Sequence, residues 1–553
     1  VDIDNQAVEV TKLSLLLKVL EGESDQRIST QLKMFQERAL PNLGNNIKCG
    51  NSLIGIDFFK DNPDIAEDEL YRINPFDWHG EFTEVMKNGG FDVVIGNPPY
   101  IRIQTMKEWA STDLDYYKQK YKSTSKGNYD IYVIFVERGL QLLNENGCTG
   151  FILPHKFFNS KYGEPLREII SQGKHLNKVI HFGAQQIFTG ATTYTCLLFL
   201  SKLSNITFNF IKIENLINWR NTGQSIEGKI STEMVLSKEW NFVVGKNTIL
   251  FEKLTKMPFK LGNVANIFVG VQTSADDIFI MDLVTKTENE ITLNSKSLNI
   301  EWTFETTLLF PIVSGTDVSP YKDLYGRQYI LFPYTITDEK ADLIDFNILL
   351  QNYPKTANYL LKNKQRLENR EKGKFKDSQW YRFGRNQNIG IQMIKKLCIP
   401  RLVEYLYATY DTNGSFILDN VDVGGVIFTS DYKNHNLLYL LGLVNSKLLR
   451  WYFPFVSAPF RGGWLSANRQ FLSQVPIRII NFNETFDKIK HDQIVELVNR
   501  MLISNQKLSS TRTPQEKNLL QRQIEMMDRQ INQLVYELYE LTEEEIKIIE
   551  EII

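Results

Sequence analysis

The sequence predicts an α/β protein whose first half forms a doubly wound sheet. Apolar stretches rich in β-branched residues alternate there with amphipathic stretches, and FDVVIG (91–96) has the near-continuous apolar character of a buried parallel strand. Strands that alternate with helices are typical of one sheet built with right-handed crossovers. At 553 residues, the chain is long enough for several domains.

The elements expected in this half follow in chain order. VDID (1–4) ends a strand, residues 5–20 form a helix, and NIKCGNSL (46–53) is a strand and turn. After the strand at 91–96, residues 130–147 form a helix closed by Gly147. CTGFILP (148–154), KVIHFG (178–183) and TYTCLLFLSK (193–202) complete the sheet. The segment between Tyr100 and Asp130 is polar, irregular and long, which is typical of a loop beside a site.

The pattern changes near residue 245. Short strands and turns, with a helical stretch near 340–370, predict that a mixed α+β domain over 246–485 follows a first domain over 1–245. Residues 486–553 are expected to be helical. Within residues 513–551, leucine and isoleucine recur at mixed spacings of three and four, which favours a docked helical hairpin over a long coiled coil.

Composition narrows the protein class. No apolar run reaches the ~18 residues of a membrane span, and the N-terminus lacks the pattern of a signal peptide, so we expect a soluble cytoplasmic protein. The four cysteines are far apart and have no CxxC or Cys/His pairing. We therefore expect buried thiols, with neither a disulfide framework nor a metal site.

The net charge of −2 conceals a basic segment. Residues 351–480 carry 19 Lys and Arg against 8 Asp and Glu. A solvated surface is the common explanation for such an excess. Here the basic residues alternate with aromatic and amide residues, as in WYRFGRNQN (380–388) and FRGGWLSANRQ (460–470). That mixture suits phosphate contacts combined with base contacts, so we favour a nucleic-acid partner.

The strand at 91–96 is followed by Asn97, Pro98, Pro99 and Tyr100. Prolines cannot continue a sheet ladder, so they turn the chain away where open α/β sheets bind ligands. An amide oxygen beside a proline carbonyl offers two fixed acceptors for a planar NH2 group such as the amino group of adenine. An adenine within duplex DNA must be flipped out to reach them, and Tyr100 offers a face for stacking. A purely structural turn explains the four residues less well.

NPPY after a strand, with VDID and GNSL upstream, resembles the gamma-class (TaqI-type) N6-adenine DNA methyltransferases. The closest resemblance is to the methylase and specificity part of type II restriction–modification enzymes, which often include a nuclease. It covers nearly the whole chain and implies a Rossmann-like class I methyltransferase sheet with S-adenosyl-L-methionine as methyl donor. It also implies that Asn97 and the Pro98 carbonyl hold the amino group of a flipped adenine, while Tyr100 stacks on the base.

The resemblance implies further site residues. The cofactor-binding residues would be Asp2, Ile3, Asn51, Ser52 and Asn97. The family usually has Asp where Asn51 stands, but an amide oxygen can still accept a hydrogen bond. Phe188 would stack on the far side of the base, although a core role for it is equally consistent with the residues alone. The catalytic set is Asn97, Pro98, Pro99, Tyr100 and Phe188.

The downstream half resembles the target-recognition domain of the same DNA methyltransferases. NPPY-like tetrads also occur in enzymes that methylate glutamine in proteins or an exocyclic amine in RNA, but the protein glutamine methyltransferases lack such a domain. We expect double-stranded DNA to contact arginines through phosphate or guanine and amides through base edges. These candidates are Gln272, Arg382, Arg385, Asn386, Gln387, Arg461 and Arg469.

No glycine-rich motif of the DPACGSG type occurs in the sequence, which begins with Val1. We expect this sequence to be the C-terminal part of a longer chain, with a nuclease region or restriction subunit as a further partner. Three functions remain open: an adenine methyltransferase of a restriction–modification or phage-exclusion system, the methylase part of a fused endonuclease, and a non-catalytic DNA-specificity subunit. The intact NPPY argues against the last.

Overall fold

The computed structural model describes residues 1–21, 42–188, 190 and 193–551. The chain divides into two compact units, Val1–Gly245 and Lys246–Ile553. Across these described ranges, no helix combines the length and the apolar character needed to cross a bilayer.

A six-stranded sheet organises the first unit in the order β1-β2-β4-β3-β5-β6. β1 is parallel to β2 and β3 is parallel to β5, whereas β4 is antiparallel to both β2 and β3. The predicted α/β class is confirmed, but the sheet is mixed rather than purely parallel. Parallel neighbours need a long crossover, and the described residues between β3 and β4 contain no helix. The strands are β1 (Phe91–Gly96), β2 (Leu143–Pro154), β3 (Leu176–His181), β4 (Thr195–Ser201), β5 (Thr207–Lys212) and β6 (Ile226–Ser231).

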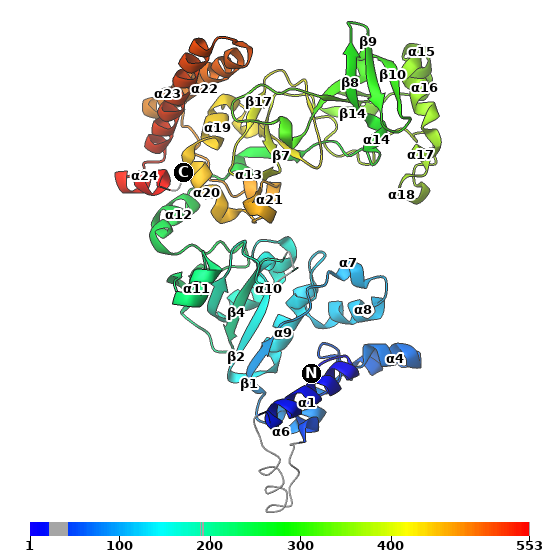
Figure 1. Cartoon of the computed structure of the whole chain (residues 1–553), viewed down its shortest axis with the longest axis vertical. Coiled ribbons are helices and arrows are strands. Elements are labelled where there is room, and N and C mark those ends of the chain that lie inside the picture. The colour runs from blue at the N-terminus through cyan, green and yellow to red at the C-terminus, as the bar shows by residue number, and fades with distance from the viewer. Residues whose placement is uncertain (22–41, 189, 191–192, 552–553) are drawn as a thin grey trace, which may run out of the picture. The chain divides into compact units, whose positions relative to one another are not determined.

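Helices surround this sheet (Figure 1). The predicted helix at 5–20 is confirmed as α1 (Asn5–Leu20), and the Asp4 side chain caps it by accepting the Gln6 N–H. α9 (Tyr132–Leu142) packs on β1 and β2, and α10 (Glu164–Gln172) contacts α9. The other helices are α3 (Phe58–Asp61), α4 (Glu67–Ile73), α5 (Trp78–Glu81), α6 (Thr83–Lys87), α7 (Ile103–Met106), α8 (Ser111–Lys120) and α11 (Leu216–Thr222).

Three local expectations need correction. The helix expected at 130–147 ends at Leu142, because Leu143 is extended and pairs with Phe91 at the start of β2. The segment expected as a strand at 46–53 makes only single bridges, at Cys49 and Asn51. The segment expected to be irregular, 100–130, contains α7 and α8, whose apolar side chains join the core of this unit.

The strand β1 is less buried than its apolar sequence predicts. Val94 packs against the core, whereas Val93 and Ile95 point to the other face and are 56% and 79% exposed. In the part of the chain that the structure describes, β1 is one of the two edge strands of its sheet. Thiol burial also differs from expectation, since Cys196 and Cys398 are buried but Cys49 is half-buried and Cys148 is exposed.

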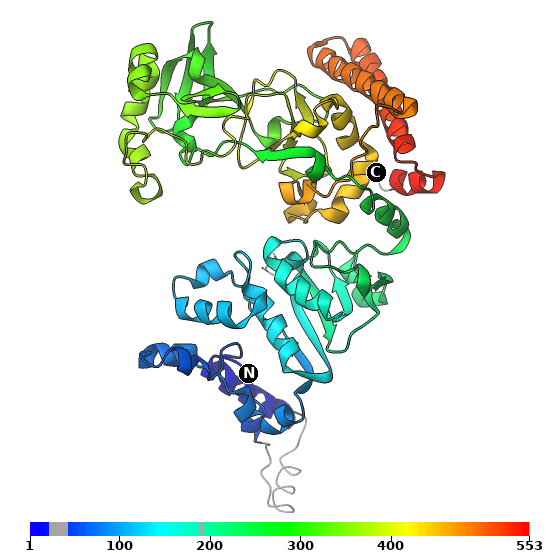
Figure 2. The ribbon, with the colours of Figure 1, turned by 180° about the vertical axis from the view of Figure 1, so that it is seen from behind.

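The second unit is a mixed α+β assembly (Figure 2). One sheet has the strand order β10-β9-β8-β12-β11-β18, and another has the order β17-β15-β19-β7. Their strands are β7 (Ala265–Val269), β8 (Ile280–Lys286), β9 (Glu290–Ser295), β10 (Ile300–Glu305), β11 (Leu309–Val313), β12 (Gln328–Leu331), β15 (Lys396–Pro400), β17 (Thr409–Asp411), β18 (Ile417–Leu418) and β19 (Val423–Phe428). Two-stranded ribbons pair β13 (Tyr334–Thr337) with β14 (Lys340–Leu343) and β16 (Leu402–Val403) with β20 (Leu465–Ser466).

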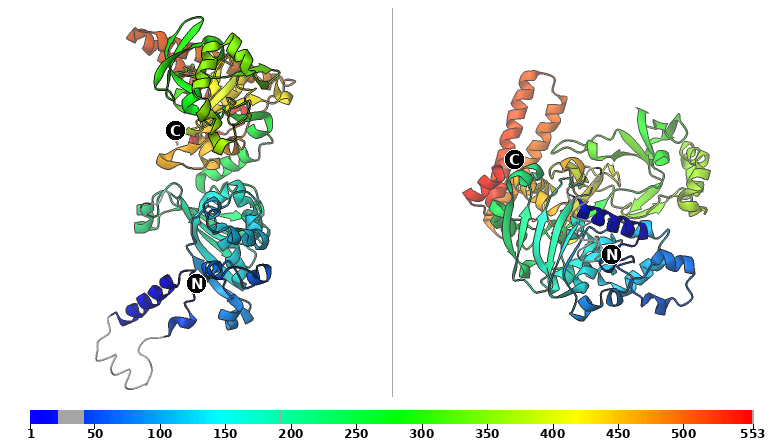
Figure 3. Two further views of the ribbon diagram at one scale, coloured as in Figure 1. Left: turned by 90° about the vertical axis from the view of Figure 1, so that its right-hand side faces the viewer. Right: turned by 60° about the horizontal axis from the view of Figure 1, so that its bottom comes forward.

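Helices complete this unit, and two of them form a hairpin near the C-terminus, although its first helix lies before the segment 513–551 in which a hairpin was expected. α22 (Thr485–Ser510) packs along α23 (Pro514–Leu538), and α24 (Glu543–Glu550) follows (Figure 3). A helical C-terminal region is therefore confirmed. The remaining helices are α12 (Thr248–Thr255), α13 (Leu261–Val264), α14 (Asp276–Phe279), α15 (Phe346–Asn352), α16 (Pro354–Lys362), α17 (Lys364–Glu368), α18 (Arg370–Gly373), α19 (Leu437–Val444), α20 (Lys447–Val456) and α21 (Arg469–Leu472).

Candidate active site and nucleic-acid interface

The NPPY corner lies where β1 ends. Asn97 is exposed directly after the strand, Pro98 is buried and Pro99 is exposed. Neither proline has an N–H with which to extend the ladder, so the chain leaves the sheet here. β1, β2 and β3 all run in one direction, and their carboxyl ends therefore share one edge of the sheet. The NPPY corner therefore lies at the edge of the sheet that the carboxyl ends of these strands form.

Tyr100 fixes the amide of Asn97. Its hydroxyl lies within hydrogen-bonding distance of two acceptors, Asn97 Oδ1 at 2.9 Å and the carbonyl oxygen of Ile152 at 3.1 Å. Burial raises the pKa of Tyr100 to about 12, so the hydroxyl keeps its proton at neutral pH. An amide oxygen has two lone pairs, and Tyr100 engages one of them. The other lone pair of Asn97 can accept a second donor.

A chain of phenols supports Tyr100. Its ring meets that of buried Tyr132 edge to face, with centroids 6.4 Å apart. The Tyr132 and Tyr162 hydroxyls are 2.9 Å apart, and Tyr162 also donates to Asp130 Oδ2 at 3.1 Å. Burial raises the pKa of Tyr132 well above its usual value. The ring of Tyr100 is thus held by packing rather than by charge.

The residues expected to hold the cofactor lie on adjacent chain segments. Asp2 and Cys49 form a parallel bridge, in which the Gly50 N–H donates to the Asp2 carbonyl at 2.8 Å. The Asp2 side chain is exposed, and one of its oxygens accepts the Asp4 N–H at 2.9 Å. Ile3 is 50% exposed beside it. An exposed carboxylate next to an exposed apolar side chain fits a ribose with its attached base.

Asn51 is buried, unlike Asp2. Its Oδ1 accepts the Leu53 N–H at 3.1 Å, and its own N–H donates to the Asn74 carbonyl at 2.6 Å. Ser52 is half-buried, and its carbonyl accepts the indole N–H of Trp78 at 3.1 Å. Part of the acceptor capacity of Asn51 is therefore used within its own turn. Its second lone pair is the one that could serve a ligand.

Phe188 is half-buried at a bend in the segment that follows β3, and two histidines missed by the sequence analysis hold the turn at Gly183, earlier in the same segment. The Gly183 N–H donates to His181 Nδ1 at 3.1 Å, and His155 Nε2 lies 3.2 Å from the Gly183 carbonyl. The two imidazole centroids are 4.2 Å apart. His155 also donates its main-chain N–H to the Tyr194 carbonyl at 3.2 Å.

Burial lowers the pKa of both histidines, to about 4 for His155 and well below the usual value for His181. The ring of His155 and the ammonium of Lys212 lower the pKa of His181 further. A neutral His181 is required, because its Nδ1 must accept a hydrogen bond. Both histidines directly follow apolar runs, in LPHKFF and VIHFG, and this position after a strand is the signal that could have identified them.

In the second unit, the structure gathers most of the candidate DNA contacts. The Arg385 N–H donates to the Gln272 carbonyl at 3.2 Å, and Asn386 and Gln387 follow as exposed residues. Arg382 lies three residues before Arg385, and its guanidinium donates to Asp377 at 2.6 Å. Two segments more than a hundred residues apart in the sequence therefore present amides and arginines at one place.

The other two arginine candidates lie elsewhere in this unit. Arg469 is exposed at the start of α21, which Figure 1 shows well away from α18. Arg461 begins a short 3-10 turn, and its side chain lies outside the described part of the structure.

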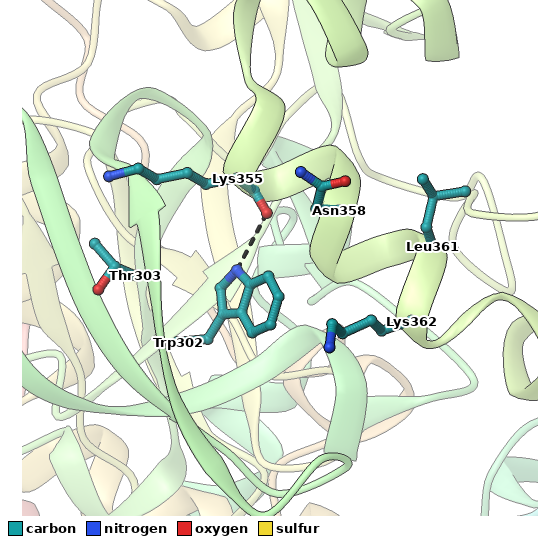
Figure 4. Close-up of a pocket in the computed structure, with 6 residues that line it drawn as sticks. All are labelled: Trp302, Thr303, Lys355, Asn358, Leu361 and Lys362. Carbon is teal, nitrogen blue, oxygen red and sulfur yellow. Dashed lines mark hydrogen bonds between the residues drawn. The ribbon is translucent and has the colours of Figure 1, made fainter.

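A hollow of about 680 Å³ between β10 and α16 was not expected (Figure 4). The indole N–H of Trp302 donates to the Lys355 carbonyl at 3.1 Å, and Lys362 Nζ lies 5.5 Å from the centre of the indole ring. Thr303, Asn358 and Leu361 complete the lining. Lys362 already covers a face of the ring, so stacking of a base there would require this side chain to move.

The mixed sheet with its NPPY corner defines the first unit as a methyltransferase-type domain. Residues 1–188 match the family described as Eco57I restriction-modification methylase, and residues 310–477 match the TaqI-like C-terminal specificity domain. The chain therefore carries an Eco57I-type restriction–modification methylase domain followed by a TaqI-like specificity domain. The resemblance inferred from NPPY, VDID and GNSL is confirmed at this level.

Two similar curated proteins are named as type II methyltransferases, and one of them is also named as a restriction enzyme. RM.Eco57I from Escherichia coli, named as a type II restriction enzyme and methyltransferase, is 30% identical over 98% of this chain. The type II methyltransferase M.BstVI from Geobacillus stearothermophilus is 21% identical over 86% of the chain and 77% of its own length. The chain spans 54% of the length of RM.Eco57I.

Among solved structures, the type IIL restriction–modification enzyme MmeI, determined in complex with DNA, has a similar fold. The TM-score is 0.53 at 14% identity, and the match covers 84% of this chain and 56% of MmeI.

Proposed function

We propose that this chain is the methylase and specificity part of a site-specific DNA methyltransferase that modifies adenine at N6 within a restriction–modification system. The observation that carries the proposal is the Asn97 amide, whose oxygen is oriented by Tyr100 and retains a lone pair at the carboxyl edge of the sheet. Similarity to type II methyltransferases supports the reaction class, and the TaqI-like specificity domain supports DNA as the substrate.

The proposed reaction needs acceptors rather than a strong base. With the target adenine flipped out, Asn97 Oδ1 and the Pro98 carbonyl accept its two amino hydrogens, which favours localisation of the nitrogen lone pair. S-adenosyl-L-methionine, when bound, supplies a methyl group activated by the positive sulfur. As the new N–C bond forms and the C–S bond breaks, the amino nitrogen loses one proton to solvent. Asp2, Ile3 and Asn51 are the residues that would hold the methyl donor.

Tyr100 has two roles in this proposal. Its hydroxyl orients Asn97, and its ring offers a face for the flipped base, with Phe188 expected on the opposite face. Flipping costs a few kcal/mol, which stacking at ~1–3 kcal/mol per base can offset. Neutral acceptors and aromatic faces together therefore account for both the holding and the activation of the base.

A fused restriction enzyme is a second candidate for the whole protein. RM.Eco57I is named as both a restriction enzyme and a methyltransferase, and this chain spans about half of its length. In that case the residues described here would supply the modification and specificity functions. A non-catalytic specificity subunit fits less well, because it would have no use for the oriented amide at Asn97.

Product analysis tests the proposal. The natural full-length protein is incubated with duplex DNA and isotopically labelled methyl donor, and the DNA is digested to nucleosides for mass spectrometry. We expect the label in N6-methyladenine. Label in a cytosine, in RNA alone or in a protein glutamine would contradict the adenine assignment.

A further inference from the structure

A second hollow, of about 520 Å³, lies in the specificity-domain unit beside α18. Glu371, Lys374, Phe375, Arg382, Arg385 and Asn386 are among the residues that line it. Three of these six residues are basic. Arg382, Arg385 and Asn386 also belong to the set of candidate DNA contacts. The hollow therefore combines positive charge with a concave shape.

The carboxylate of Glu371 is the point where the donors of this hollow converge. Arg385 Nη1 donates to Oε1 at 2.7 Å, and the Ser274 hydroxyl donates to the same oxygen at 3.3 Å. Lys374 Nζ lies 3.6 Å from the other oxygen. A guanidinium, an ammonium and a hydroxyl gathered on one anion form the donor set that proteins use for phosphate.

The backbone beneath this carboxylate is strained. Glu371, Lys372 and Gly373 have φ values of 46°, 63° and 86°, and Ser274 on the facing segment has φ 57°. Non-glycine residues in this left-handed region persist only when their surroundings hold them, and they cluster at ligand clamps. Gly384 is needed nearby, because a Cβ there would lie 1.9 Å from Ser274 Oγ.

A rigid layer holds the hollow in shape. The guanidinium carbons of Arg370 and Arg382 lie 4.0 and 4.6 Å from the centre of the Phe375 ring. Arg370 is buried and donates to the carbonyls of Thr273 and Arg382 at 2.7 and 2.9 Å. These bonds tie the segment that carries Ser274 to the segment that carries Arg385, so the donors are in place before a ligand arrives.

We propose that Arg385, Lys374 and Ser274 form a binding site for a phosphate of the DNA backbone, and that the carboxylate of Glu371 occupies this site in the free protein. The inference rests on the proposed function, which supplies DNA as the ligand. Glu371 keeps the basic side chains ordered and is exchanged for the phosphate when DNA binds.

A substitution that removes the charge of Glu371 but keeps its size tests the proposal. Glu371→Gln keeps the size of the side chain and one acceptor oxygen but removes the anion that competes with DNA. We expect equilibrium binding of the whole 553-residue chain to a DNA duplex to tighten about threefold to tenfold. The matched control is Asp277→Asn, which neutralises another exposed carboxylate paired with an arginine of this unit, Arg366. That control should change the affinity less than twofold.

Replacement of Arg385 tests the other side of the site. Arg385→Ala should weaken binding to two unrelated duplexes equally and lower the slope of log affinity against log salt by about one. Arg385→Lys should retain the salt slope but bind more weakly than the parent, because it keeps the charge and loses the planar fork. This second variant provides the test if Arg385→Ala fails to fold by circular dichroism.

Several outcomes would overturn the phosphate site. Weaker binding by Glu371→Gln would show that Glu371 only supports the hollow structurally. An equal gain in affinity from Asp277→Asn would show that any lost negative charge strengthens DNA binding. A loss in Arg385→Ala confined to one duplex sequence would indicate a base contact instead. If the parent chain shows no salt-dependent affinity for DNA, the proposed function itself fails; if it does and the variants match the control, only the phosphate site fails.

Discussion

The NPPY corner and the turn around Glu371 hold their polar groups in opposite ways. At the corner, a neutral phenol orients a neutral amide, and prolines direct the chain. At the turn, Glu371, Lys374 and Arg385 hold one another by charge above a strained backbone. Short neutral contacts suit an acceptor that must meet a reacting atom, whereas mutually paired charges suit a site whose ligand brings its own charge.

The NPPY corner and the turn around Glu371 should also differ in their sensitivity to salt. Exposed ion pairs are weak and are screened by salt, so the arrangement at Glu371 can open at low cost. The hydrogen bond from Tyr100 to Asn97 is backed by the buried Tyr132 and involves no ionised group. Substitutions and salt should therefore separate catalysis from binding.

The largest expected effect follows the loss of the Asn97 amide. Asn97→Ala removes one of the two acceptors for the amino group, and the single-turnover rate of methyl transfer should fall by about 10²–10³-fold, as for loss of one preorganised polar group in other enzymes. DNA affinity should stay within twofold, because the basic side chains of the second unit are unchanged. Asn221→Ala, at an exposed amide in the same unit, is the control. A normal rate in Asn97→Ala would contradict the mechanism.

Salt should change the affinity for DNA rather than the rate of methyl transfer. Between 50 and 200 mM salt, we expect DNA affinity to fall by roughly 10²-fold or more. The reason is that the release of condensed counterions from DNA, which accompanies binding of basic side chains, becomes less favourable as the salt concentration rises. The rate of methyl transfer at saturating DNA should change little, because the acceptors are neutral. Fluorescence anisotropy and single-turnover assays measure the two quantities. A flat salt response of the affinity would exclude a basic recognition surface.

Sequence reasoning predicted the corner better than the turn, because the corner is local. The helix over 5–20, the strand over 91–96 and the NPPY tetrad are each encoded by neighbouring residues, and the hydroxyl of Tyr100 reaches an amide only three positions away. What the sequence did not predict at β1 was the exposure of Val93 and Ile95. That exposure depends on which elements cover the strand and not on the strand itself.

The hollow beside α18 depends on contacts between residues that are distant in the sequence. Ser274 and Glu371 are 97 positions apart, and Arg385 meets Gln272 through main-chain atoms that carry no sequence signal. Basic and amide residues predicted the kind of ligand, but left-handed residues other than glycine could not be predicted. The pairing of His155 with His181 was missed for the same reason, since it requires the register of two strands.

A smaller effect is expected from removing only the hydroxyl of Tyr100. Tyr100→Phe keeps the ring for stacking but leaves the Asn97 amide unoriented, so methyl transfer should slow by about tenfold, the worth of one hydrogen bond. Phe188→Ala is the complementary change, which should reduce the fluorescence of 2-aminopurine at the target position while leaving Asn97 oriented. If Tyr100→Phe lowers that fluorescence as much as Phe188→Ala does, the hydroxyl serves flipping instead.

The smallest effect concerns the two histidines that hold the Gly183 turn, and it appears as a dependence of stability on pH. Above pH 6.5 both imidazoles are neutral whether the chain is folded or unfolded. Between pH 6.5 and about 4, the unfolded chain binds protons that the folded one does not, because burial lowers the pKa of His155 to about 4 and that of His181 still further. The free energy of unfolding should therefore decrease as the pH falls through this window, by about 1–2 kcal/mol after allowance for partial exposure.

Thermal unfolding between pH 7.5 and 5 measures this dependence, and its slope, rather than the absolute stability, is the informative quantity. His155→Gln should reduce the slope, and the double variant His155→Gln/His181→Gln should reduce it further. Part of the slope should remain, because burial also lowers the pKa of His175 and that of His435. His79→Gln, at an exposed histidine of the same unit, should leave the slope unchanged. In the folded protein His181 stays neutral across this window and keeps accepting the Gly183 N–H, so 2-aminopurine flipping by the folded protein should not change with pH there. A double variant that retains the full slope would show that the Gly183 turn is not held by neutral histidines.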